Sequence, residues 1–205
     1  MKFRGVKAAD NDALCAISLA TGFAGKDASH LYRDRTLIGQ IYSAPYACLE
    51  PDLGLVAEDP DGVAGFIVGV VDTLAWEQRL DREWWPRLRE RYARPAGPPS
   101  EWSPDERRIE MIHSPEIAPR SVSSAFPGHV HLNLLPRLQG RGIGSELLRH
   151  WFTLTQRRGP VATHVGVNRE NDRALKFWAR SGFRPLDVED GATRTVWMGR
   201  SALLP

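Results

Sequence analysis

The sequence predicts an α/β domain, because short apolar, β-branched runs alternate with longer stretches whose apolar residues recur at helical spacing. A chain of 205 residues with 42% hydrophobic content can bury a substantial core, so we expect one domain, or one domain with a large insertion. The most informative stretch is His129 to Ser145, where an apolar strand enters a turn rich in Gly and Arg and then an amphipathic helix.

The first third of the chain predicts a strand, two helices and a hairpin. Asp10 or Asn11 can cap the first helix, and Pro45 and Pro51 are expected to interrupt the helical pattern after the second. The dipeptide Asp61-Gly62, between two apolar runs, is a strong hairpin signal. In chain order, these elements are a strand at Phe3–Val6, a helix from Asp10 or Asn11, a helix around Leu31–Tyr42, and strands at Leu53–Ala57 and Val63–Val71.

After Asp72 the pattern changes to an aromatic-rich segment. An apolar residue recurs every fourth position from Trp76 to Tyr92, but Pro86 interrupts this stripe, so we expect a kinked helix or two short ones. Ser103 to Glu106 has the composition of an N-cap with Pro at the first helical position and a capping-box Glu. His113 to Pro127 is rich in Pro and Ser and is expected to be irregular. A block of this kind between two core strands is expected to cover a cleft or a partner surface.

The last third predicts alternating strands and helices. These are a strand at about His129–Leu135, a helix at Gly142–Gln156, a strand at Val161–Val167, a helix capped within Asn168–Asn171 and ended by Ser181-Gly182, and an antiparallel pair at Phe183–Val188 and Thr193–Met198 joined by a loop containing Asp190-Gly191.

Composition narrows the function classes. The 27 basic and 25 acidic residues give a net charge of +2, which argues against an extended nucleic-acid footprint. No apolar run approaches the length of a membrane span, and the N-terminus has no signal-peptide core, so we expect a cytoplasmic protein with no membrane partner. Cys15 and Cys48 have no metal-ligand spacing; we expect both to be small core residues in a reducing compartment, and no metal site.

The turn after the central strand predicts an anion site. A helix N-terminus offers unpaired N–H groups and the positive end of the helix dipole. A Walker A loop is excluded because Gly144-Ser145-Glu146 lacks its Lys. A Rossmann turn fits poorly, because Ser145 stands at the third glycine position and no acid follows the next strand for the ribose.

A third pattern fits better. The residues Gln139-Gly140-Arg141-Gly142-Ile143-Gly144, hereafter the glycine turn, resemble the Q/R-x-x-G-x-G/A signature of the GNAT acetyltransferases. Asn168 to Trp178 and Ser181-Gly182-Phe183 resemble the helix that follows the fifth strand of that family, in the family's order and spacing. The resemblance implies a GNAT fold, in which a mixed, mostly antiparallel sheet is flanked by helices and its fourth and fifth strands splay apart.

The resemblance implies acetyl-coenzyme A as cofactor. Glycines in the turn let a pyrophosphate approach backbone N–H groups, while Gln139, Arg137 and Arg141 can add donors. The pantetheine arm is expected to pair with backbone atoms of Leu134 and Leu135, whose side chains can pack in the core at the same time. The cofactor residues implied are Leu134, Leu135, Arg137, Gln139, Gly140, Arg141, Gly142, Ile143, Gly144, Ser145, Asn168, Asn171, Ala174, Phe177 and Trp178.

The catalytic groups are less defined. The family often places at Trp178 a Tyr that protonates the departing thiolate, which an indole cannot do, so Trp178 is left to pack on the pantetheine or in the core. A backbone N–H near Leu134 can stabilise the oxyanion. For the base we favour His131 over His129 and Asn133 on the same strand face, which can equally be a polar, solvated face. Asp72 is another candidate, with turn capping as its alternative role.

A closer resemblance covers most of the chain. Glu58 to Thr73, Trp84 to Gly97, the Ser103–Glu106 segment and Phe126-Pro127 resemble the acetyltransferase-like C-terminal domain of O-GlcNAcase enzymes. Those relatives have an Asp in the fourth strand where this chain has Asn133. We therefore expect a single GNAT domain over residues 1–205, with an insertion at about 73–128 between strands three and four.

The expected function is acetyl transfer from acetyl-coenzyme A to an amine by direct attack. The acceptor is a small molecule or a peptide, and the protein is a monomer or a homodimer. The alternative is a coenzyme-A-binding or protein-interaction module of the same fold that has lost catalysis.

Overall fold

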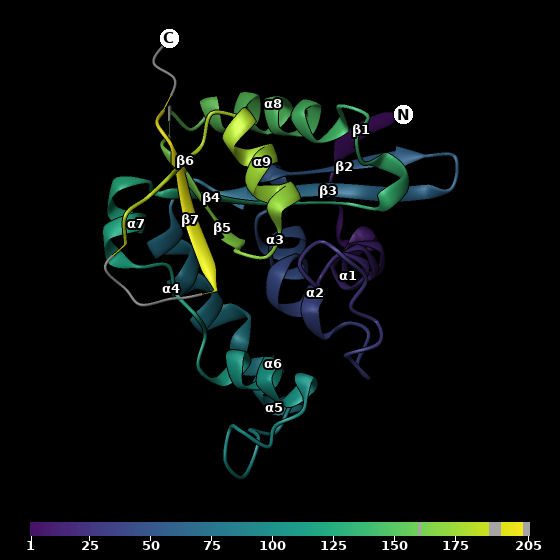
Figure 1. Ribbon diagram of the computed structural model, residues 1–205, viewed down its shortest axis with the longest axis vertical. Helices are drawn as coiled ribbons and strands as arrows, with labels where there is room; N and C mark the ends of the chain where they lie inside the picture. The colour runs from purple at the N-terminus through teal and green to yellow at the C-terminus, as the bar shows by residue number, and fades with distance from the viewer. Residues whose placement is uncertain (160, 189–193, 203–205) are drawn as a thin grey trace.

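The computed structural model describes residues 1–159, 161–188 and 194–202, and a seven-stranded sheet lies at its centre (Figure 1). The strand order is β1-β2-β3-β4-β5-β7-β6, and β4 with β5 is the one parallel pair among the described strands. The mixed, mostly antiparallel sheet is therefore confirmed. Its strands are β1 (Lys2–Gly5), β2 (Gly54–Asp59), β3 (Gly62–Val70), β4 (Gly128–Leu134), β5 (Thr163–Asn168), β6 (Arg184–Pro185) and β7 (Thr195–Arg200).

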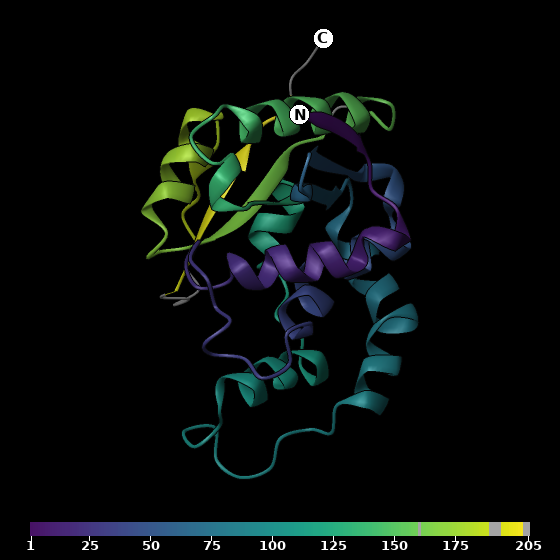
Figure 2. The ribbon, with the colours of Figure 1, turned by 90° about the vertical axis from the view of Figure 1, so that its right-hand side faces the viewer.

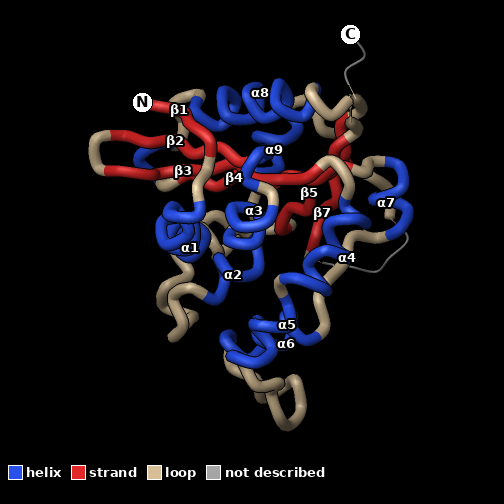
Figure 3. Tube along the Cα trace, turned by 180° about the vertical axis from the view of Figure 1, so that it is seen from behind, coloured by secondary structure: helices blue, strands red, loops and turns tan. Residues whose placement is uncertain are grey.

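Helices cover both faces of the sheet (Figures 2 and 3). Phe66, Val68 and Val70 of β3 pack in a core with α1 to α5, whereas Ile67 packs in a second core with α8 and α9. This follows from the two-residue period of a strand. The helices are α1 (Asn11–Ala20), α2 (Leu37–Tyr42), α3 (Ala44–Leu49), α4 (Thr73–Glu83), α5 (Trp85–Arg91), α6 (Pro104–His113), α7 (Arg120–Ala125), α8 (Ile143–Gln156) and α9 (Asp172–Arg180), with 3₁₀ turns η1 (Ala8–Asp10), η2 (Pro51–Leu53) and η3 (Pro136–Leu138).

The two parallel strands diverge soon after they meet. β4 and β5 pair only at Gly128 with Thr163 and at His129 with His164. β4 then stays paired with β3 as far as Leu134, while β5 pairs with β7 as far as Asn168. From Val130 onward the edge of β4 that faces β5 is unpaired, which is the splay that the family resemblance implied.

The segment between β3 and β4 contains α4 to α7, and α5 and α6 lie farthest from the sheet (Figure 1). The predicted stripe forms two helices that meet at Trp84, directly before Trp85-Pro86. The capping box is confirmed: Ser103 Oγ accepts from Glu106 N–H, and Glu106 Oε2 accepts from Ser103 N–H at 2.7 Å. None of the helices in the described ranges is both long and apolar enough to cross a bilayer.

Three predicted elements are wrong in extent. Residues 31–36 form turns rather than a helix, because the Asp34 carboxylate binds Thr36 N–H and Oγ1 and competes with helical hydrogen bonding. The segment 113–127, predicted to be irregular, contains α7, and the strand expected at 183–188 is only the two-residue β6. Asp190-Gly191 and Thr193, predicted for the last loop and strand, lie outside the described residues.

Two smaller expectations also change. Pro45 lies in the first turn of α3, where a missing N–H costs nothing, so the helical pattern resumes there. Cys15 is buried as expected, but Cys48 is exposed at the end of α3, where its sulfur accepts from Asn11 Nδ2 at 3.1 Å.

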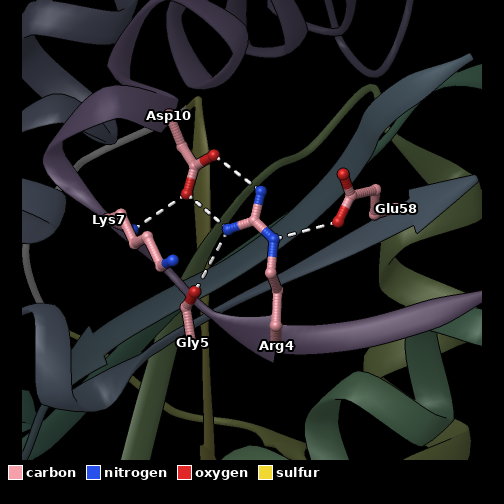
Figure 4. A network of polar contacts seen from close by, with 5 residues as sticks. All are labelled: Arg4, Gly5, Lys7, Asp10 and Glu58. Atoms are coloured by element: carbon pink, nitrogen blue, oxygen red, sulfur yellow. Dashed lines mark hydrogen bonds and ion pairs between the residues drawn. The ribbon is translucent and has the colours of Figure 1, made fainter.

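The N-terminal strand is fixed by an ionic network (Figure 4). Arg4 donates through Nη1 and Nη2 to Asp10, both at 2.8 Å, and through Nε to Glu58 at 2.9 Å. Asp10 precedes α1 as predicted, but its carboxylate accepts from Arg4 and from Lys7 N–H and does not cap that helix. The network joins β1, η1 and β2.

Candidate active site

The unpaired edge of β4 presents the backbone of Leu134. Leu135 N–H donates to Ala64 O at 2.8 Å, across the ladder with β3. Hydrogen-bonding residues alternate along an antiparallel strand, so Leu134 directs its N–H and C=O away from β3, towards β5. Its C=O accepts from Gln139 Nε2 at 2.7 Å. Of the two backbone positions predicted to bind the cofactor, Leu134 therefore faces the open side, whereas the N–H of Leu135 is used by β3.

The glycine turn ends at an open helix N-terminus. Gly140 and Gly142 have φ of 74° and 79°, a region that favours glycine. Gly142 precedes α8, no side chain caps this end, and no heavy atom beyond its chain neighbours lies within 4 Å of where a Cβ would stand. Ile143 and Gly144 are buried behind the turn, and Ser145 is exposed. The first N–H groups of α8 can therefore receive an anion.

Two of the predicted phosphate donors have partners of their own. Arg137 forms an ion pair with Asp59, with Nε to Oδ2 at 2.8 Å. Gln139 accepts from Arg173 of α9 and is anchored to Leu134. Arg141 is exposed, donates to Arg137 O at 3.3 Å, and forms no ion pair with any carboxylate in the described ranges. Of the two arginines, Arg141 is therefore the one whose guanidinium can reorient to bind a phosphate without breaking an ion pair.

The helix α9 packs against the start of α8. A Cβ on Gly144 would lie 3.1 Å from Phe177, so glycine is needed for this close approach. Trp178 is only 4% exposed and packs edge-on against Phe183, in the core with Ala174. Trp178 thus takes the core position that was one of its two predicted roles.

The two asparagines predicted to bind the cofactor shape the entry to α9. Asn171 Oδ1 caps the helix by accepting from Ala174 N–H at 3.0 Å, and Asn168 Oδ1 accepts from Glu170 N–H at 2.9 Å. A Cβ on Gly25 would lie 2.9 Å from Asn171 Nδ2, so the loop after α1 meets α9 beside the splayed strands.

On the opposite face of the sheet from α8, the buried His129 and the half-buried His131 lie against Tyr46. Thr73 Oγ1 donates to Pro127 O at 2.7 Å, because a carbonyl can only accept, and therefore accepts from His129 Nδ1 at 2.8 Å. His129 Nε2 then carries no proton and accepts from Tyr46 Oη at 2.6 Å. Burial and the neighbouring His131 and His164 hold the pKa of His129 well below its usual value. His129 is thereby a neutral, fully engaged side chain.

His131 differs from His129 in having no such partners. It contacts the rings of Tyr42, Tyr46 and His129, at centroid distances of 6.1, 5.4 and 5.7 Å, but within the described chain it makes no hydrogen bond or ion pair. Burial, with a contribution from His164, lowers its pKa to about 4. At neutral pH it is an unprotonated imidazole with free ring nitrogens, which a base requires.

The other predicted bases are engaged elsewhere. Asn133 donates from Nδ2 to Thr21 Oγ1 at 2.7 Å and so fixes the end of α1. Asp72 is exposed and caps α4 by accepting from Ala75 N–H at 3.0 Å, which is the turn-capping role considered for it. No group of His, Cys, Asp and Glu in the described ranges is arranged to hold a metal.

Sequence reasoning missed the residues that surround these histidines. Tyr42 and Tyr46 come from α2 and α3, and Thr73 from α4, far from β4 in sequence. Aromatic residues at helical spacing are typical of a hydrophobic core. Nothing in their pattern distinguishes those that also contact the histidines of β4.

Comparison with known proteins agrees with this geometry. The chain is 32% identical to a protein of known structure described as SsHAT, with a TM-score of 0.89 over 99% of this chain and 98% of that one. It is 24% identical over 167 residues to the protein O-GlcNAcase of Rattus norvegicus. The matched stretch covers 80% of this chain but only 18% of that protein. The PaiA N-acetyltransferase of Thermoplasma acidophilum, solved with coenzyme A, has the same fold at 14% identity, with a TM-score of 0.51 over 98% of each chain.

The acetyltransferase (GNAT) family matches residues 14–183, a stretch that contains the splayed strands, the glycine turn and α9. This chain therefore belongs to the acetyltransferase (GNAT) family.

Proposed function

We propose that this protein transfers the acetyl group of acetyl-coenzyme A to an amine by direct attack. One observation carries the proposal: the unpaired edge of β4 is connected by η3 and the glycine turn to the open N-terminus of α8. An extended amide-containing arm can pair with such an edge, and a pyrophosphate fits an uncapped helix start. The coenzyme A bound to the related PaiA enzyme supports the choice of ligand.

The residues present fit this ligand. Gly142 leaves space beside the first N–H groups of α8, and Arg141 can add a bidentate contact. Bound acetyl-coenzyme A would supply a thioester carbonyl for attack by the amine. Leu134 N–H, which points to the open side of β4, is the donor placed to stabilise an oxyanion there.

His131 is the proposed base. An attacking amine must lose a proton as it forms its bond to carbon, and His131 has an unprotonated nitrogen with no competing partner. The hydrogen bonds of His129 with Tyr46 and Thr73 fix β4 next to His131. They also hold His129 as a neutral imidazole whose two nitrogens are both engaged. With Trp178 in the core, no phenol at that position protonates the sulfur, but a thiolate with a pKa of about 8.5 can leave unaided.

The test is acceptor-dependent thiol release from acetyl-coenzyme A across a panel of amines. We expect release with the wild-type protein and a loss of about a hundredfold or more in kcat/KM for His131→Gln, with coenzyme A affinity unchanged. His30→Gln, at an exposed histidine outside the site, is the control and should keep full activity.

The burial of Trp178 favours one alternative, a module that binds coenzyme A without turnover. Coenzyme A binding with no thiol release from any amine would support that alternative and contradict acetyl transfer.

A further inference from the structure

Arg108 of α6 is a partly buried cation with no carboxylate partner. Its Nε donates to Tyr32 Oη at 3.0 Å, and its Nη1 donates to Tyr42 Oη at 2.8 Å. Nη1 also contacts Met111 Sδ at 3.0 Å. Within the described residues no Asp or Glu forms an ion pair with it, and Glu116, the acid whose charge it feels, is exposed and does not reach it.

Several other arginines between β3 and β4 form ion pairs. Arg79, Arg89 and Arg94 each form an ion pair with an acidic residue of the same segment, and Arg91 does so with Asp34. A cation withdrawn from water is costly unless an anion compensates it. Arg108 is also half-buried, yet its side-chain contacts in the described residues are two phenols and the Met111 sulfur. The charge of Arg108 therefore has no compensating anion among the described residues.

Donors remain for such an anion. Tyr32 Oη accepts from Arg108, so its own hydrogen is free to donate, and no described group accepts it. Tyr42 Oη instead donates to Met111 Sδ at 3.7 Å. Arg108 Nη2 makes no hydrogen bond to any described residue. The free Nη2 and the Tyr32 hydroxyl therefore form a pair of donors suited to a carboxylate or phosphate.

The pair lies close to the proposed base. The Tyr42 ring is 5.5 Å from Arg108 Cζ and 6.1 Å from the His131 ring. The guanidinium is therefore separated from the imidazole by one aromatic side chain, and is no farther away than the sum of those two distances. An acceptor that contacts both groups must therefore span no more than this separation between its acid and its amine.

We propose that Arg108 and Tyr32 bind an anionic group of the acceptor, so that the substrate is an amine that carries a carboxylate or phosphate at its other end. The proposal rests on the proposed acetyl transfer and names its substrate class. His131 then receives the amine end, and α6 receives the acid. Glu116 opposes such a ligand through its charge, so Glu116→Gln strengthens the preference for anionic acceptors.

The test compares kcat/KM for hexylamine, aminohexanoate and aminohexyl phosphate, which separate a neutral acceptor from a carboxylate and a phosphate. We expect the wild-type protein to prefer an anionic acceptor over hexylamine by about tenfold or more in kcat/KM, and Arg108→Gln to abolish that preference, read as the ratio of the two values within each protein. Tyr32→Phe should reduce it in part. Arg107→Gln removes an exposed arginine from the same helix and should leave it intact.

Equal preference in wild-type and Arg108→Gln proteins would overturn the inference while leaving acetyl transfer in place. A melting temperature and a coenzyme A affinity equal to those of the wild-type protein exclude misfolding of Arg108→Gln. If Arg108→Gln does not fold, Arg108→Lys replaces it, because Lys keeps the charge but loses the bidentate contact. If no amine is acetylated, acetyl transfer itself fails. Calorimetry with N-acetylaminohexanoate then still tests the anion site: Arg108→Gln should bind this acid at least about tenfold more weakly than the wild-type protein does, and equal affinity would contradict the site.

Discussion

Tyr46 Oη donates to His129 Nε2 across 2.6 Å, and this contact joins α3 to the strand that carries the proposed chemistry. Both side chains are buried, and the second nitrogen of His129 is bound by Thr73. Every polar atom of this imidazole is therefore satisfied by protein. The neighbouring His131 is left as the free one.

Tyr46→Phe should destabilise the fold. It removes the donor to a buried nitrogen, and an unsatisfied buried acceptor costs about 1–3 kcal/mol of unfolding free energy. Urea denaturation measures the loss. Thr153→Ala, which removes an exposed hydroxyl, should change the unfolding free energy by no more than about 0.5 kcal/mol, and an equal loss in both variants would contradict this account.

Acidification should destabilise the protein before its carboxylates titrate. Burial lowers the pKa of His129, His131 and His164 below 6.5, to about 4 for His131. Below about pH 6.5 these histidines are protonated in the unfolded chain but stay unprotonated in the folded protein. The unfolding free energy therefore decreases as the pH falls from about 6.5 towards 4. Denaturation at several pH values measures this slope, which should be shallower in His131→Gln. A flat profile over that window would show that the histidines are not buried as neutral groups.

Asp10→Asn should destabilise the N-terminal strand. The substitution removes a carboxylate that is 10% exposed and binds Arg4 at 2.8 Å, while Asn preserves the shape. We expect a loss of about 1–3 kcal/mol in unfolding free energy at neutral pH. Asp52→Asn, at an acid that is 86% exposed, is the matched control and should have little effect.

The same carboxylate predicts a second acid transition. The Arg4 guanidinium holds the pKa of Asp10 below 3.8, so its contribution is present above that pH and is lost as the pH falls through the lower, folded value. Asp10→Asn should remove this transition and leave the histidine slope above pH 4 unchanged.

The pH–rate profile should follow the acceptor rather than the base. Since the pKa of His131 is about 4, the imidazole is unprotonated from about pH 5 upward. The rate should then rise with pH until the acceptor amine is deprotonated, which for a lysine-like amine is near pH 10. The profile should shift with the amine's own pKa. A break near pH 6.5 that is common to all acceptors would contradict the assignment of His131 as a base with a lowered pKa.

The sequence alone predicts the alternation of strands and helices and the glycine turn, because each has a local signal. The splay was implied by the resemblance to the GNAT family. Gly140 and Gly142 adopt positive φ within a turn that leads into a helix, and the order of strand, turn and helix is visible in the residues themselves. Asp72 and Trp178 were each assigned two roles. In the structure the capping and core roles, which depend on local geometry and hydrophobicity, are the ones observed.

The acceptor side could not be predicted in the same way. The contacts of Tyr46 with His129 and of Arg108 with Tyr32 join residues 83 and 76 positions apart. Nothing in a local pattern distinguishes Arg108 from Arg107, yet one is partly buried against two phenols and the other is exposed. The first pairing depends on how α3 packs against β4, and the second on how α6 packs against the loop before α2, so both become visible only in the folded structure.

The most direct test of the cofactor site is the affinity for coenzyme A of Gly142→Asp, measured by calorimetry. Gly142 has φ of 79° and open space around it, so Asp strains the backbone but meets no neighbouring atom, and it puts a negative charge where the pyrophosphate is expected. Gly142→Asn has the same shape without the charge. Gly97 lies outside the glycine turn, also has a positive φ of 75° and has no neighbouring atom within 4 Å of a Cβ. Gly97→Asp therefore controls for adding one negative charge to the protein outside the turn.

We predict that coenzyme A binds the wild-type protein, that Gly142→Asp weakens this affinity by about tenfold or more, and that Gly142→Asn and Gly97→Asp retain most of it. Equal affinity in the Asp and Asn variants at position 142, or no binding to the wild-type protein, would contradict the assignment of the glycine turn as the cofactor site.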